Sequence, residues 1–143
     1  MLILVFVFQK ECPVKRIQPS AVPASNAPFS QLVMDDQYAF LAGLVAADFA
    51  EGIAVLGDVA KETEAVMTAI RSMLEEVGLS MSQLVQVSVH LSDLDDFDAM
   101  DAVYRSFFAD SEFPARTTTE SRRLFGDSKV EITCQARLNA GSD

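Results

Sequence analysis

The sequence has few residues that bind metal ions or form disulfides. It contains one histidine, His90, two cysteines, Cys12 and Cys134, and no tryptophan. A lone histidine and two distant cysteines lack the clustered spacing of a zinc site, and a disulfide framework in so small a chain needs more cysteines. We therefore expect no metal site, and reduced thiols in a cytoplasmic protein.

Positive charge is also scarce. The chain has 11 lysine and arginine residues against 21 aspartate and glutamate residues, which gives a net charge of −10. Such a surface repels phosphate backbones and anionic lipid headgroups, so the composition disfavours nucleic acid and membrane partners. A small anionic ligand remains compatible with it where a few local cations outweigh the overall field.

No apolar run is long enough to cross a membrane, which takes about 20 residues. The apolar opening from Met1 to Phe8 has no basic segment before it and no small-residue cleavage site soon after it. We expect this segment to be an additional edge strand, or an extension at the start codon, rather than a targeting signal.

What the sequence does contain is typical of one folded domain. Half of its 143 residues are hydrophobic and 22% are charged, which is enough apolar material for a core. We predict an N-terminal extension over residues 1–16, one domain over residues 17–138 and a tail over residues 139–143. Residues 19–28 hold three prolines among polar residues, which predicts a loop, and we expect regular structure to begin after it.

Two periodicities alternate along this domain. Alternating apolar residues predict strands, apolar residues at helical spacing predict helices, and Asp58 and Gly78 are suited to cap the first helix. The predicted elements are strands over 30–34 and 37–45, a helix over 58–78, a strand over 85–91, a helix over 97–108, and strands over 116–122 and 129–138.

This β-β-α-β-α-β-β order predicts an α+β fold, in which two helices pack on one face of a mixed β-sheet. Asp35 and Asp36 form the expected hairpin turn, and Gly43 inside a strand indicates a bulge or a close backbone approach. The helix-free face would carry polar groups beside scattered apolar ones. We therefore expect self-association to cover it.

Three short motifs resemble the RidA/YjgF family, also called the endoribonuclease L-PSP family. They are Pro28-Phe29-Ser30-Gln31, Pro114-Ala115-Arg116 and Val130-Glu131-Ile132, and they occur in the family's order along residues 17–138. The resemblance implies a chorismate-mutase-like α+β fold and a homotrimer with sites in the clefts between subunits. It also implies hydrolysis of reactive enamine or imine intermediates to 2-keto acids and ammonia.

The residues at these positions suit that chemistry. Arg116 presents a planar fork for the carboxylate of a small metabolite, and Glu131 on the neighbouring strand would activate a water that attacks the C=N carbon. A backbone N–H near Thr118 would position the water, and no cofactor is then needed. We include Phe29, Ser30 and Gly43 among the substrate-binding residues. The alternative is that Arg116 and Glu131 form only a cross-strand ion pair.

Some residues depart from the family pattern. Phe29 replaces the usual tyrosine, and Ala42-Gly43-Leu44 replaces the common Ser-Gly-Gln, so a phenol, a hydroxyl and an amide are missing. These changes favour an altered substrate, and they leave open a second function, a non-catalytic trimer that binds small carboxylates or has a regulatory role. An endoribonuclease ranks below both, because the chain lacks a basic groove with aromatic platforms.

Other conspicuous residues have structural interpretations. The acidic cluster Asp93, Asp95, Asp96, Asp98 and Asp101 lacks the pattern of a calcium loop, and it is expected to cap a helix and face solvent. His90 is expected at a surface or interface, and Cys134 as an inert buried thiol.

Overall fold

The computed structural model describes residues 13–139. The expected extra strand at Met1 to Phe8 lies outside the described residues. Within them, the helices and strands are, in chain order, β1 (Lys15–Ile17), β2 (Leu32–Met34), β3 (Tyr38–Val45), α1 (Ala50–Ile53), α2 (Val59–Glu76), β4 (Leu84–Leu91), α3 (Phe97–Arg105), β5 (Ala115–Glu120) and β6 (Val130–Arg137).

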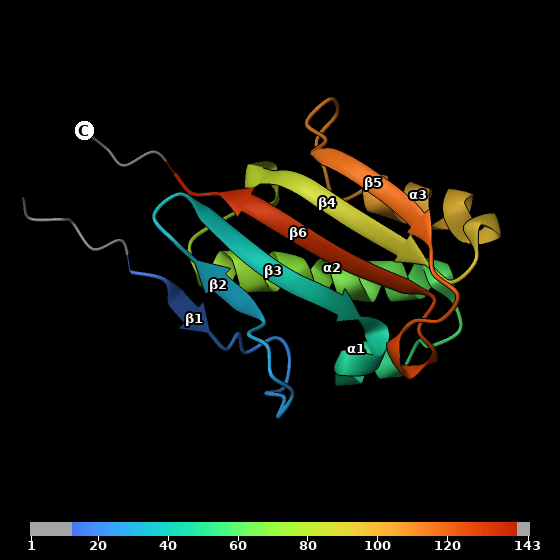
Figure 1. Ribbon diagram of the computed structural model, residues 1–143. Helices are drawn as coiled ribbons and strands as arrows, with labels where there is room; N and C mark the ends of the chain where they lie inside the picture. Colours follow the sequence, from blue (N-terminus) through green and yellow to red (C-terminus); the bar gives the residue numbers. More distant parts are fainter. Residues whose placement is uncertain (1–12, 140–143) are drawn as a thin grey trace, which may run out of the picture.

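The six strands form one mixed sheet in the order β1-β2-β3-β6-β4-β5. β4 and β5 run parallel, and the other neighbouring pairs are antiparallel. Figure 1 looks onto one face of this sheet, with α2 and α3 behind it. The predicted α+β architecture with two main helices on one face is therefore confirmed.

Three features of the predicted elements are corrected. Regular structure begins before the proline-containing loop, because β1 pairs antiparallel with β2. β1 has only three residues, and two of them, Lys15 and Arg16, are exposed, so it carries no apolar alternation. The second helix ends at Arg105 rather than at residue 108, and the short helix α1 follows β3.

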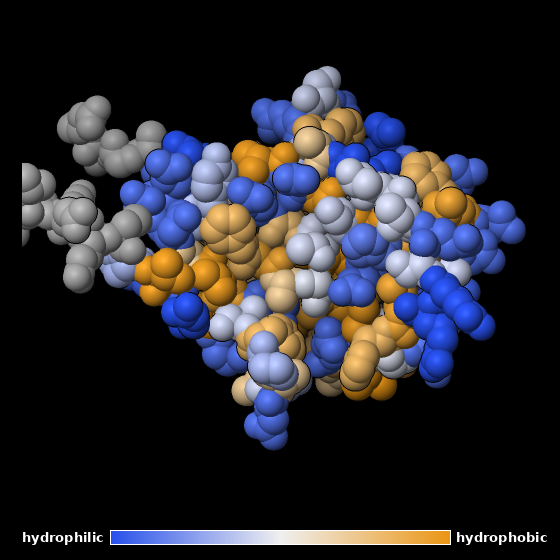
Figure 2. Space-filling view, viewed as in Figure 1, coloured by the Kyte–Doolittle hydropathy of each residue, from blue (hydrophilic) through white to orange (hydrophobic). Residues whose placement is uncertain are grey.

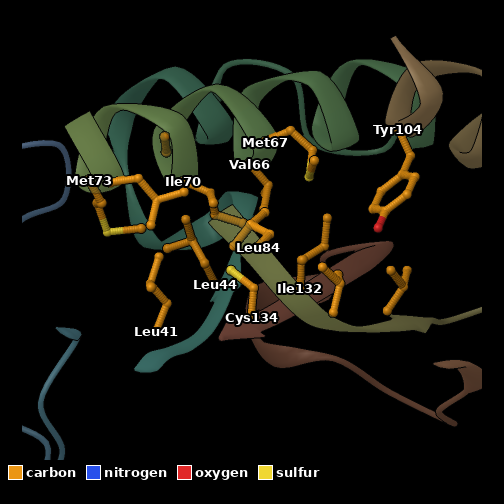
Figure 3. Packing of buried hydrophobic residues seen from close by; sticks show 14 of the residues in the cluster. Leu41, Leu44, Val66, Met67, Ile70, Met73, Leu84, Tyr104, Ile132 and Cys134 are labelled. Carbon is orange, nitrogen blue, oxygen red and sulfur yellow. The ribbon is translucent and has the colours of Figure 1, made fainter. Parts of the chain in front are cut away.

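The hydrophobic core lies between α2 and the sheet (Figure 3). Val66, Met67 and Ile70 of α2 face Ile132 and Cys134 of β6, and all five side chains are buried. Burying a side chain of this size stabilises the fold by about 2 kcal/mol. The predicted α2 caps are present, because Asp58 Oδ1 accepts from the Lys61 N–H at 3.1 Å and Gly78 has a φ of +78°.

The pairing register shifts at two places. Between Leu41 and Leu44 the extra residue lets both leucines point into the core, so Gly43 marks a bulge as expected. A second shift between Leu84 and Gln86 turns Leu84 inward and leaves Val85 41% exposed. The simple alternation predicted from Val85 onward is therefore wrong at its first residue.

The helix-free face of the sheet is shown in Figure 2, where apolar side chains lie among polar ones. A shallow hollow there is lined by Phe40, Gln86, Ser88, Thr133 and Gln135, among others. Within residues 13–139, no second layer covers this face.

No helix in the part of the chain that the structure describes is both long and apolar enough to cross a membrane.

Candidate functional site

Arg116 lies on β5, at one edge of the sheet. It stands opposite Val87 of β4, and Val87 is buried in the core. Residues opposite each other on paired strands point to the same side of a sheet. The Arg116 side chain is therefore on the helix-covered side, where it meets α3.

Three side chains of α3 hold the Arg116 guanidinium. Its central carbon lies 4.7 Å from the ring centroid of Tyr104 and 5.4 Å from that of Phe97. Its Nη1 donates to Asp101 Oδ1 at 2.7 Å. Phe97, Asp101 and Tyr104 are spaced by four and three residues, so they share one face of the helix. Aromatic and ionic contacts together hold the guanidinium in one orientation.

Arg116, together with Asp101 and Tyr104, also lines a hollow of about 290 Å³, which we call the α3 pocket. Asp101, Tyr104, Arg105, Phe113 and Arg116 form its walls. The Tyr104 hydroxyl is buried and has no hydrogen-bond partner among the described residues. Burial raises the pKa of Tyr104 to about 12, so the hydroxyl keeps its proton and remains a donor.

Glu131 is on the other side of the sheet. It lies on β6 opposite His90 of β4 and Val45 of β3, with Ile132 beside it pointing into the core. Its carboxylate occupies the space beside Gly43 that a Cβ at that position would fill. The bulge and the missing side chain of Gly43 therefore make room for the carboxylate.

The Glu131 carboxylate opens into a second hollow of about 480 Å³, which we call the β6 pocket. Phe29, Gly43, Phe125 and Glu131 are among the residues that line it. Phe125 is 81% exposed and Phe29 is 53% exposed, so both rings offer apolar surface to a ligand or to another chain. The pocket thus combines one carboxylate with apolar walls.

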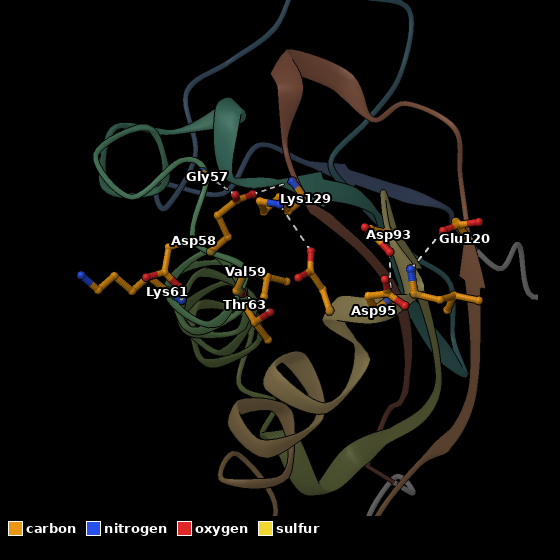
Figure 4. A network of polar contacts seen from close by, with 12 residues as sticks. Gly57, Asp58, Val59, Lys61, Thr63, Asp93, Asp95, Glu120 and Lys129 are labelled. Atoms are coloured by element: carbon orange, nitrogen blue, oxygen red, sulfur yellow. Dashed lines mark hydrogen bonds and ion pairs between the residues drawn. The ribbon is translucent and has the colours of Figure 1, made fainter.

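A buried carboxylate fixes the start of β6. Glu62 of α2 is fully buried and accepts hydrogen bonds from the backbone N–H groups of Gly57 and Lys129, each at 2.8 Å. Figure 4 shows these bonds, together with the 3.4 Å contact between the Lys129 ammonium and Asp96. Because Lys129 is two residues from Glu131, this network ties the position of Glu131 to α2.

The structure brings some of the predicted site residues together and separates others. Phe29, Gly43 and Glu131 line the β6 pocket, and Ser30 is half-buried next to Phe29. Arg116 lies on β5, and Thr118 lies two residues further along the same strand. The two groups of residues are on opposite sides of one sheet.

The prediction that Arg116 and Glu131 lie on neighbouring strands is wrong. β4 lies between β5 and β6, and Arg116 pairs with Asp101 instead. The cross-strand ion pair proposed as an alternative is therefore also wrong. The expectation that Asp101 caps a helix and faces solvent is wrong, because it lies inside α3 and binds Arg116. Its spacing from Phe97 and Tyr104 is the signal in the sequence that indicates a shared helix face.

The other residues singled out from the sequence line neither the α3 pocket nor the β6 pocket. Leu44 is buried in the core, so its difference from the family's glutamine lies away from both pockets. His90 is half-buried, and its Nδ1 lies 2.6 Å from Thr119 Oγ1. Cys134 is buried as expected, and burial raises the pKa of its thiol to about 12. Asp93 accepts from the Asp95 N–H at 2.8 Å, which is a helix cap.

Comparison with known proteins identifies the family. The model of the family described as endoribonuclease L-PSP matches residues 19–138. The chain belongs to the endoribonuclease L-PSP (RidA/YjgF) family. The resemblance seen in the sequence motifs is thereby confirmed.

Individual L-PSP family members are similar over most of their length. A RutC family protein of Pyrococcus abyssi is 37% identical over 110 residues, which is 77% of this chain and 86% of that protein. The 2-iminobutanoate/2-iminopropanoate deaminase of Bos taurus is 34% identical over 118 residues, 82% of this chain and 85% of that protein. The crystal structure of the YjgF gene product from E. coli matches with a TM-score of 0.76 and 29% identity, covering 86% of this chain and 98% of that one.

Proposed function

We propose that this L-PSP family protein hydrolyses 2-imino acids, and the enamines from which they form, to 2-keto acids and ammonia. The observation that carries the proposal is the pair of pockets, one holding the Arg116 guanidinium and the other the Glu131 carboxylate. The bovine relative, named as a deaminase for 2-iminobutanoate and 2-iminopropanoate, supports the choice of reaction.

The two residues act in one site only if two copies of the chain meet. Within one chain they lie on opposite sides of the sheet with β4 between them. We propose a homotrimer in which the α3 pocket of one subunit faces the β6 pocket of the next. The uncovered sheet face and the exposed rings of Phe125 and Phe113 give such an assembly apolar surface to bury.

In this site each group has a separate task. The remaining N–H donors of Arg116 bind the substrate carboxylate, which places the adjacent C=N carbon. Glu131 accepts a proton from a water molecule as that water attacks the carbon, and a backbone N–H near Thr118 orients the water. The iminium acid R–C(=NH₂⁺)–COO⁻ and water then become R–CO–COO⁻ and NH₄⁺.

The reaction as written uses the electrophilicity of the imine itself, so the proposal includes no metal ion and no cofactor. Phe29 stands where a tyrosine is usual, and it contributes an apolar wall rather than a hydroxyl. We place the reaction in the cytoplasm, in keeping with the two cysteines of the sequence.

The test generates 2-iminopropanoate enzymatically and follows its conversion to pyruvate with and without the protein. We expect acceleration by the wild type, no activity in Arg116→Ala, and little rescue by Arg116→Lys, because an ammonium cannot form the bidentate fork. Glu131→Gln should keep ligand binding and lose a factor of about 10² to 10⁴ in turnover.

Two results would overturn the assignment. Wild-type turnover in folded Glu131→Gln would remove Glu131 from the chemistry. Arg116-dependent binding of small carboxylates without any turnover by the wild type would support the alternative function, a carboxylate-binding or regulatory trimer. Thermal melts of each variant separate these results from a loss of folding.

A further inference from the structure

We propose that Asp101 binds the nitrogen of the ligand and makes the α3 pocket selective for α-imino and α-amino acids over the corresponding 2-keto acids. This inference rests on the proposed function, because it takes Arg116 as the carboxylate-binding group. It adds a second recognition element to that site and names the chemical class that the site prefers.

Both partners of the Arg116–Asp101 ion pair keep atoms that can form further hydrogen bonds. Among residues 13–139, Arg116 uses Nη1 for Asp101 Oδ1, and its other N–H groups remain as donors. Asp101 Oδ2 lies 3.9 Å from Arg105 Nη2, which is too long for a hydrogen bond. The pocket therefore presents a guanidinium edge next to a carboxylate oxygen that can still accept.

An α-imino or α-amino acid carries the complementary pair of groups. Its carboxylate and its nitrogen are attached to adjacent carbon atoms, so binding of the carboxylate to Arg116 brings the N–H groups near Asp101. The pocket volume of about 290 Å³ is at the lower end for ligand sites, which suits a metabolite of this size. Asp101 and Arg116 side chains are 26% and 22% exposed, so their interactions are only partly screened by water.

The charge balance of the α3 pocket also favours α-imino and α-amino acids over 2-keto acids. Arg105 and Arg116 against Asp101 give a local charge of 2 − 1 = +1. This charge admits a carboxylate, while Asp101 disfavours any further oxygen acceptor beside it. A keto acid has an acceptor where the imino acid has a donor. Hydrolysis therefore converts a well-bound substrate into a product that Asp101 repels, which assists product release.

The test measures dissociation constants for L-alanine and pyruvate with the full chain, by calorimetry or ligand-observed NMR. The wild type should bind alanine more tightly than pyruvate. Asp101→Asn should weaken alanine and strengthen pyruvate, so that the ratio of the two constants changes by about tenfold or more, the effect of one charge-assisted hydrogen bond. Asp98→Asn, which removes an exposed carboxylate of the same helix, should leave the ratio unchanged.

Several results would overturn the inference. If Asp101 only positions Arg116, its replacement weakens alanine and pyruvate by the same factor and the ratio stays constant. If Asp101→Asn fails to fold, the wild-type comparison still decides, because equal affinity for alanine and pyruvate contradicts nitrogen recognition. Failure of the proposed function looks different: the wild type then shows the alanine preference, dependent on Arg116, but no hydrolysis of 2-iminopropanoate.

Discussion

The absence of a side chain at Gly43 is predicted to set the position of the proposed general base. A Cβ at this position would meet the Glu131 carboxylate oxygen and would lie 3.0 Å from its carboxyl carbon and 3.2 Å from Thr133 Oγ1. Ordinary contacts at a Cβ begin near 3.4 Å. In Gly43→Ala the carboxyl group therefore has to move, by roughly 1 Å, and a misplacement of this size costs about 10²-fold in turnover.

The same substitution should have little effect on stability. The group displaced is the far end of a flexible side chain, and the φ of Gly43 is outside the positive range that disfavours other residues. Replacing a glycine lowers the conformational entropy of the unfolded chain, which stabilises the folded state by about 0.4–1 kcal/mol and offsets the strain. We expect a melting temperature within about 4 °C of the wild type.

The assay compares 2-iminopropanoate hydrolysis in Gly43→Ala, Glu131→Gln and the double variant. If the methyl group acts through Glu131, the double variant loses no more activity than Glu131→Gln alone, because the two effects are not additive. Full activity in folded Gly43→Ala would show that the added methyl group does not displace the Glu131 carboxylate. Multiplied losses in the double variant would refute it as well, since they would show that the methyl acts elsewhere.

Two further predictions concern stability. Glu62→Ala removes the buried carboxylate that accepts from the backbone N–H groups of Gly57 and Lys129, and it should lower the free energy of unfolding by about 3 kcal/mol. The exposed Glu64→Ala should change it by less than about 0.5 kcal/mol in matched thermal melts, and equal melting temperatures of the two variants would contradict this. Burial raises the pKa of the Cys134 thiol from a usual value of 9.0 to about 12. As pH rises, the thiol therefore loses its proton in the unfolded chain before it does so in the folded protein. The free energy of unfolding should fall between pH 9 and pH 12, by at most about 1.4 kcal/mol per pH unit. Cys134→Ala should flatten this part of the melting-temperature profile, and an unchanged slope would show that the thiol contributes nothing to it.

The elements of the fold are mostly readable from local patterns. The Asp58 carboxylate caps the start of α2, and Gly78 follows its end with a positive φ. The apolar alternation of β6 places Ile132 and Cys134 in the core. The short strand β1 is not readable from such local patterns. β1 has three residues with one partly buried side chain, so no period develops.

Only part of the arrangement of the site can be predicted from the sequence. Phe29, Gly43 and Glu131 converge as the motifs indicate. The order of strands in the sheet depends on tertiary pairing, and β6 inserts between β3 and β4, which places β4 between Arg116 and Glu131. The alternation of β6 does indicate that Glu131 faces away from the core, but no local period in the sequence reports which strands are neighbours.

The central claim is that Arg116 of one subunit and Glu131 of another form one active site. Its most direct test mixes two inactive variants, Arg116→Ala and Glu131→Gln, by co-expression or by joint refolding at equal amounts. In random trimers half of the subunits supply the arginine and half supply the glutamate, so one half times one half, about one quarter, of the sites are intact. We expect recovery of about one quarter of wild-type 2-iminopropanoate hydrolysis. A mixture that contains both variants in one assembly but is still inactive would show that the two residues do not share a site.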